Sequence, residues 1–157
     1  MPKSSRQREV TPLDQKIEQM LTEARVMLPG VQALLGFDLL VTFTRAFESL
    51  SAASKGVHIA GMACAALTMI LLMAPAAFHR ITFGGEDTES MHHIGSFFVT
   101  CAALPLGLSI GANAYVAAAK ATDHAGVAAA IALGLSAVLL VLWYVKPLLD
   151  RRERGAT

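Results

Sequence analysis

The chain has 157 residues, of which 54% are hydrophobic and 16% are charged, and its formal net charge is +1. A water-soluble domain carries about a quarter charged residues, so this composition favours a protein embedded in a lipid bilayer. The near-neutral charge gives no broad basic field for nucleic acid, so we expect no nucleic-acid partner, and the length suits one domain.

The first thirty residues are more polar than the rest. We expect residues 1–10 to form a disordered tail. Over residues 11–29, apolar side chains recur at helical spacing along one stripe: Leu13, Ile17, Leu21, Ala24 and Leu28. Charged residues avoid that stripe, which predicts an amphipathic helix at the membrane interface. The pair Pro29-Gly30 predicts a break before the first membrane span.

Four apolar stretches follow, and each is long enough to cross a hydrocarbon core of roughly 30 Å as a helix of about 20 residues. They run over residues 31–50, 57–78, 94–119 and 126–145. Short loops join them, so neighbouring helices should be antiparallel. The sequence therefore predicts an all-α fold, with a four-helix transmembrane bundle over residues 30–147 and a basic cytoplasmic tail over residues 148–157.

The basic residues are unevenly divided between the two sides of this predicted bundle. If both termini are cytoplasmic, three of the 13 Lys and Arg residues lie outside, namely Arg45, Lys55 and Lys120, and the remaining ten lie inside. Basic residues favour the cytoplasmic side of a membrane. We therefore predict a multi-pass protein of the bacterial inner (cytoplasmic) membrane with both termini in the cytoplasm.

The first predicted span carries an acid, Asp38, near its middle. Thr42 and Arg45 follow four and seven residues later, so in a continuous helix all three share one face. A lone carboxylate in hydrocarbon is costly unless it is protonated, paired or hydrated. On the third span, Ser109 and Asn113 lie four residues apart and can add hydrogen-bonding groups to the same interior. These five residues are the predicted proton or ion path.

Two hypotheses for the function follow from Asp38. In the first, the carboxylate exchanges protons and the chain is a small antiporter-like transporter, coupling protons to a cation or solute. In the alternative, the chain is a non-catalytic membrane scaffold or assembly subunit, and Asp38 forms a static contact with Arg45 or Thr42. An interior Asp38 with a water path favours the first, and a closed Asp38–Arg45 pair favours the second. Because no enzyme motif is present, we predict no enzymatic activity.

The segment between the second and third spans, residues 78–93, is rich in acids and histidines. Glu89 and His92 lie three residues apart, which is the spacing found in di-iron bundles, but the chain carries this pair only once. A third hypothesis is a histidine-bound metal or haem module. The histidine pairs that it would use are His79 with His92 or His93, and His58 with His124. Since these histidines sit at span ends, we predict no metal and no cofactor.

Two stretches carry a resemblance to a known family: TEARVMLPGVQALLGF (22–37) and LLMAPAAFHRITFGGEDTE (71–89). They resemble a bacterial family of unknown function, made of short four-span integral membrane proteins that are often automatically labelled sodium:proton antiporters. The resemblance covers residues 13–147 and implies an inner-membrane protein with an amphipathic lead-in helix, but no established reaction. Its motif positions here are Glu23, Arg25, Pro29, Gly30, Gln32, Pro75, His79, Arg80, Gly85, Glu86 and Glu89. Position 38 is not among them.

The resemblance also draws attention to a cytoplasmic polar cluster, which we define as Glu23, Arg25, His79, Arg80, Glu86, Glu89 and His92. In the predicted orientation, all seven lie at the cytoplasmic interface. We expect an ionic network among them that joins the lead-in helix to residues 78–93 and locks the inner face of the bundle. Because four short helices enclose little interior, we also expect a homo-oligomer, with membrane lipids and a proton or small cation as the other partners.

Overall fold

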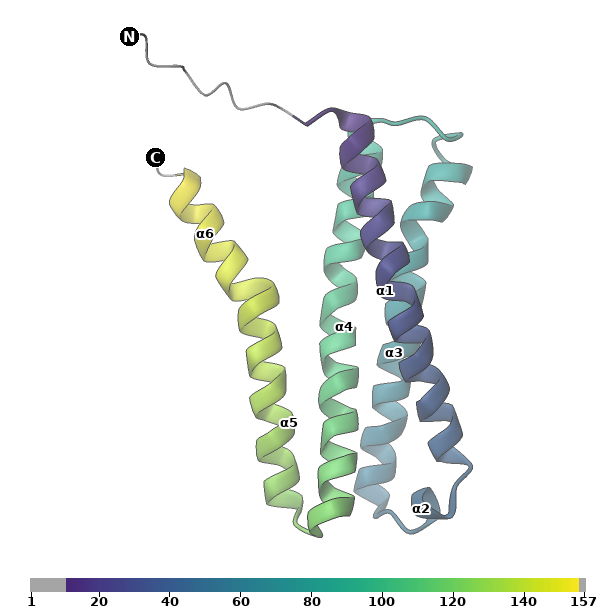
Figure 1. The fold of residues 1–157 in the computed structure, drawn as a ribbon, viewed down its shortest axis with the longest axis vertical. Helices are drawn as coiled ribbons and strands as arrows, with labels where there is room; N and C mark the ends of the chain where they lie inside the picture. Colours follow the sequence, from purple (N-terminus) through teal and green to yellow (C-terminus); the bar gives the residue numbers. More distant parts are fainter. Residues whose placement is uncertain (1–10, 156–157) are drawn as a thin grey trace, which may run out of the picture.

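The structure is a computed structural model that describes residues 11–155, so the predicted tail over residues 1–10 lies outside the described residues. Every regular element in this range is helical. The elements are α1 (Leu13–Thr42), α2 (Arg45–Glu48), α3 (Ala52–Ile81), α4 (Glu89–Thr122), α5 (Ala125–Leu140), the π-helical turn η1 (Val141–Val145) and α6 (Lys146–Gly155). The start of α1 and the end of α6 lie at one end of the molecule, and α2 lies at the other (Figure 1). The all-α prediction is confirmed.

Four helices are long and apolar enough to span a membrane: α1, α3, α4 and the continuous helix Ala125–Glu153. The last contains the most apolar stretch of the four. The long helices run antiparallel to their neighbours along the chain (Figure 1). The expectation of four apolar helices is therefore confirmed, although their boundaries differ from the predicted spans.

The largest difference concerns α1, which is one helix of 30 residues. The predicted break at Pro29-Gly30 is wrong, so residues 11–29 do not form a separate interfacial helix, and the span expected over 31–50 ends at Thr42. Both Pro29 and Gly30 are exposed on the outer face of the helix. Proline removes one backbone hydrogen bond, to the carbonyl of Arg25, while buried residues on both sides keep the helix packed.

The most extensive contact between two helices joins α3 to α4. Buried residues of α3 recur at alternating spacings of four and three, which is the pattern of a coiled-coil seam: Ser54, His58, Gly61, Ala65, Thr68, Leu72 and Pro75. Small residues of α4 face them, and a Cβ added to Gly61 would lie 2.7 Å from the Cβ of Ala112. Because lipid tails are as apolar as leucine, such close packing is the main source of attraction between helices in a bilayer.

Helix α1 packs across this α3–α4 pair along a single stripe. Ile17, Ala24, Val31 and Asp38 are all buried and lie seven residues apart. The first three belong to two apolar clusters that α1 forms with α3 and α4. Asp38 therefore occupies the next place of a repeat that is otherwise hydrophobic, and this explains why a carboxylate is buried at that position.

The C-terminal helix packs mainly on α4. Its contacts use Gly107 and Gly111, beside which lie Leu139 and Ser136, and the Tyr144 hydroxyl donates to the Thr100 carbonyl over 2.7 Å. The predicted tail over residues 148–157 is helical as far as Gly155, where α6 ends. Within α5, Ala128 is the one buried residue, so most of this helix faces away from the bundle.

Candidate functional site

Asp38 is the buried acid of the molecule, with 3% of its surface exposed. Its Oδ2 accepts a hydrogen bond from the Asn113 side-chain amide over 3.3 Å. No cation pairs with it in the described part of the chain, where the one ion pair joins two other residues. A carboxylate without a counter-charge in an apolar bundle is either protonated or hydrated, because an ionised lone group is expensive there.

A histidine from α3 contacts the same turn of α1. The Nε2 atom of His58 lies 3.0 Å from the Asp38 backbone carbonyl and 3.3 Å from the Thr42 hydroxyl, and Thr42 itself donates to the Asp38 carbonyl over 2.9 Å. A carbonyl can only accept, so Nε2 is the donor in its contact with the Asp38 carbonyl.

The α4 side of the site contains a hydroxyl without a partner. Asn113 also donates to the Ser109 carbonyl one turn earlier, over 3.1 Å. Ser109 is fully buried, and its Oγ is the one buried side-chain polar atom that makes no hydrogen bond among the described residues. An unpaired buried hydroxyl costs free energy, so it marks a place where a water molecule or another polar group would be stabilised.

A cavity of about 220 Å³ adjoins this site on the side of α2, and both His58 and Asn113 line it. Phe47 of α2 lines the same cavity, with its ring centroid 5.3 Å from that of His58. At the rim, Lys120 donates to the Ser49 hydroxyl over 2.9 Å. His58 and Asn113, which contact the Asp38 turn, therefore also line a cavity on the α2 side of the molecule.

The structure corrects two expectations about this site. Arg45 belongs to α2 rather than to the helix of Asp38, because α1 ends at Thr42, and the guanidinium is exposed. The predicted shared face of Asp38 and Arg45 is therefore wrong. Asp38 also lies four residues before the end of α1, about 6 Å along the axis, rather than in the middle of a span. Asp38, Thr42, Ser109 and Asn113 do come together as predicted.

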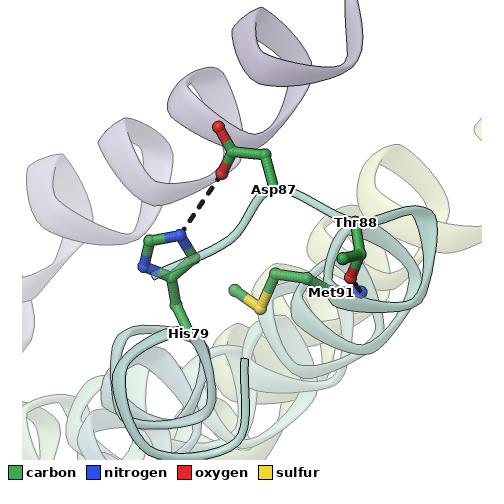
Figure 2. A network of polar contacts seen from close by, with 4 residues as sticks. All are labelled: His79, Asp87, Thr88 and Met91. Carbon is green, nitrogen blue, oxygen red and sulfur yellow. Dashed lines mark hydrogen bonds and ion pairs between the residues drawn. The ribbon is translucent and has the colours of Figure 1, made fainter. Parts of the chain in front are cut away.

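The cytoplasmic polar cluster does not form one network. Its one ion pair within residues 11–155 joins His79 Nε2 to Asp87 Oδ1 over 3.3 Å, and Asp87 was not among the predicted members (Figure 2). Beside it, the Thr88 hydroxyl accepts from the Met91 amide and caps α4 (Figure 2). Glu86 and Glu89 are exposed. The expected ionic lock is therefore replaced by a short connection within the α3–α4 turn.

The other members of this cluster separate onto two sides of α1. Glu23 and His92 line a cavity of about 290 Å³ between α1 and α4. Arg25 and Arg80 line a different groove, between α1 and α3. Residues 23 and 25 are two positions apart, about 200° around a helix, so one α1 helix directs them to opposite sides.

No group of three or more metal-ligating side chains gathers within residues 11–155. His79 contacts Asp87, and His58 is hydrogen-bonded to the Asp38 turn. His92 and His93 have ring centroids 6.0 Å apart because they are sequence neighbours. The histidine placement thus offers individual polar contacts and no assembled ligand set.

Residues 6–147 match the model of a family of unknown function, DUF6328. The chain belongs to DUF6328. No curated protein matches it, and no solved structure does. The resemblance to a family of unknown function is thus confirmed, and the DUF6328 match itself specifies no activity.

Within this DUF6328 chain, some resemblance positions have clear structural roles. Gly85 follows Gly84 in the α3–α4 turn, and both have positive φ, of 87° and 60°, which glycine adopts without strain. Pro75 is buried in α3 and lies against Gly95 of α4. These positions shape the turn and the helix contact.

Sequence reasoning missed His58 as a partner of Asp38. The signal was present in the hairpin register, because in an antiparallel pair residues equally far from the turn lie at the same depth. His58 lies as far after Glu48 as Asp38 lies before it. The misplaced end of the first span, at residue 50 rather than at Thr42, hid this symmetry.

Proposed function

We propose that the chain is a small proton-coupled membrane transporter in which Asp38 binds the proton. The observation that carries the proposal is a carboxylate with 3% exposure and no cationic partner in the described residues, beside two groups that reach a cavity. Intramembrane acids in such surroundings mark proton and ion paths.

The surrounding groups suit both protonation states of Asp38. The Asn113 amide donates to Asp38 Oδ2, a contact that an ionised carboxylate can accept. A protonated acid would instead donate, and the Ser109 hydroxyl and the Asn113 amide oxygen are acceptors on the same face of α4. His58 both contacts the Asp38 turn and lines the cavity, so it is the group that would pass a proton between them.

The cavity that would give access lies toward the α2 end, and Asp38 would reach it through His58 and Asn113, which line it. On the other side of Asp38, the stripe continues with Val31 and Ala24, which pack into an apolar cluster with Ala65, Leu72 and Ala102. This cluster separates the α2-end cavity from the cavity at Glu23 and His92. Transport by alternating access requires that this apolar cluster opens while the cavity at the α2 end closes.

The scaffold hypothesis remains the alternative, because the same hydrogen bonds join α1 to α3 and to α4 and would also serve a static bundle. A flux measurement separates the two functions. Purified full-length protein is reconstituted in vesicles containing a pH-sensitive dye, and sodium, potassium or proton gradients are imposed. We expect flux through the wild type and its loss in Asp38→Asn.

Asp14→Asn is the matched control, because Asp14 lies exposed on the same helix. It should keep the wild-type flux. Thermal unfolding in detergent checks that both variants fold. Absence of flux in the wild type under every gradient contradicts transport and favours the scaffold; full flux in a folded Asp38→Asn removes Asp38 as the proton carrier.

A further inference from the structure

A groove of about 950 Å³ runs between α1 and α3, at the end of the molecule where α1 begins. Along α3 it extends from Ile70 to Ile81, about 16 Å at 1.5 Å per residue. That length matches one leaflet, roughly half of a 30 Å hydrocarbon core. Its walls are mostly aliphatic, and among them are Leu28 of α1 and Met73 and Ala77 of α3.

Two arginines line this apolar groove, Arg25 from α1 and Arg80 from α3. Neither forms an ion pair with any residue of the described range. Two acids lie near it: Glu23 lines the cavity on the α4 side, and Asp87 contacts His79, which itself lines the groove. The groove therefore combines apolar walls with two arginines that form no ion pair with a carboxylate of residues 11–155.

The direction of the two side chains brings their charges toward each other. Side chains of a helix lean toward its N-terminus. Because α1 and α3 are antiparallel, Arg25 leans toward the end of the bundle where α1 begins, and Arg80 leans away from that end. Arg25 shares the groove with Leu72 and Met73, so it lies beside an apolar wall where a cation without an anion is costly.

A second copy of the chain is a poor occupant for this groove. In a two-fold dimer whose axis is perpendicular to the membrane, equal residues lie at equal depth. Arginines of the two copies would then meet across the interface with no acid between them. An amphiphile with one negative charge and a long apolar chain suits both features of the groove at once.

We propose that the groove binds one anionic glycerophospholipid, with its phosphate between Arg25 and Arg80 and an acyl chain along Leu28 and Met73. The site is independent of Asp38 and of transport. Arginine recognises phosphate through paired hydrogen bonds, and the groove walls give the acyl chain van der Waals contacts.

Native mass spectrometry of the full chain in detergent tests the site. The protein is titrated with phosphatidylglycerol or with phosphatidylcholine of the same acyl chains. We expect one phosphatidylglycerol molecule to be retained, with phosphatidylcholine bound roughly 25-fold more weakly. In Arg25→Gln/Arg80→Gln, phosphatidylglycerol should bind no better than phosphatidylcholine, since each basic residue contributes about a fivefold preference.

Arg151→Gln/Arg152→Gln is the control, because these exposed arginines of α6 lie away from the groove. It should retain the lipid as the wild type does. Ala77→Trp fills the groove and leaves both arginines in place, so it should weaken phosphatidylglycerol binding. If the double variant does not fold, Arg80→Gln alone is measured, with the same expected direction.

Three results would overturn the proposal. Equal retention of the two lipids would show that the arginines do not select charge. Displacement of the lipid by soluble glycerol phosphate would show that the site recognises a free phosphate group without the groove. A stable dimer that Ala77→Trp abolishes and phosphatidylglycerol does not affect would assign the groove to a second copy.

Discussion

A carboxylate that lies among apolar helices needs donors from other elements, and Asp38 obtains one from α4 while α3 binds the backbone of its turn. Sequence alone identified the acid, Thr42, Ser109 and Asn113, because polar residues are rare in these stretches and helical spacing groups them. It could not exclude Arg45, since that required knowing where α1 ends. His58 was missed because its place beside Asp38 follows from the pairing of residues across the helical hairpin. Spacing along one helix does not show that pairing.

His58 provides the first prediction at this scale. His58→Gln keeps a nitrogen donor for the Asp38 carbonyl but removes the imidazole ring. We expect the melting temperature to stay near that of the wild type and the proton flux in vesicles to fall at least tenfold. His93→Gln, at an exposed position of α4, is the control and should leave flux unchanged. Unaltered flux in folded His58→Gln would exclude a relay through this ring.

At Ser109, we expect a substitution to leave the stability of the protein unchanged or to increase it. Its hydroxyl is fully buried without a partner, so Ser109→Ala removes a group whose burial costs about 1–3 kcal/mol. Thermal unfolding in detergent should therefore occur at an equal or higher temperature than in the wild type. If the hydroxyl stabilises a water or the protonated acid, flux falls in the same variant. A clear loss of stability would mean that the hydroxyl has a partner in the folded protein.

At the scale of the elements, the sequence located three of the four long apolar helices within a few residues and failed at α1. Pro29-Gly30 is a strong local signal for a break, but both residues face outward. The stripe of Ile17, Ala24, Val31 and Asp38 continues through them and holds the helix against α3 and α4. Tertiary packing thus overrides a local preference that amounts to a few kcal/mol.

The close approach of α3 and α4 leads to an element-scale prediction. Gly61→Ala places a methyl group 2.7 Å from the Cβ of Ala112, so the helices must separate, and we expect a loss of about 1–3 kcal/mol in the free energy of unfolding. Adding Ala112→Gly should restore most of it. Gly56→Ala in the same helix, where nothing lies within 4 Å, should be neutral or stabilising. Denaturant titration in detergent measures all four proteins.

Equal losses in the single variant and the compensated double variant would indicate that the cost does not arise from this contact. The same outcome would show that Gly61 and Ala112 are not in the close contact that the structure gives them.

For the whole molecule, the start of α1 and the end of α6 lie at the same end (Figure 1). Which side of the membrane this end faces stays a prediction, based on ten basic residues against three. Self-association also stays a prediction, and cross-linking in a bilayer measures it. The sequence could predict that four helices meet a membrane, but it could not reveal the groove between α1 and α3, because that surface depends on how two distant segments pack.

Accessibility of single cysteines tests the predicted orientation. In a variant that lacks Cys64 and Cys101, Ser49→Cys lies at the α2 end and Glu86→Cys lies at an exposed position of the α3–α4 turn, at the other end. A membrane-impermeant maleimide should label Ser49→Cys in cells with an intact inner membrane, and Glu86→Cys only after that membrane is permeabilised. The reverse pattern would place the cavity beside His58 on the cytoplasmic side.

The sparse attachment of the last long helix has a consequence for biogenesis. Only 6% of its most apolar stretch is buried by the rest of the described chain. In a bilayer its principal neighbour is therefore lipid. The translocon can then release this helix into the bilayer before it has packed against other helices. By the time this helix leaves the ribosome, α1, α3 and α4 already contain every residue of the Asp38 site. Insertion of this helix therefore follows the synthesis of all the residues that make up the polar centre.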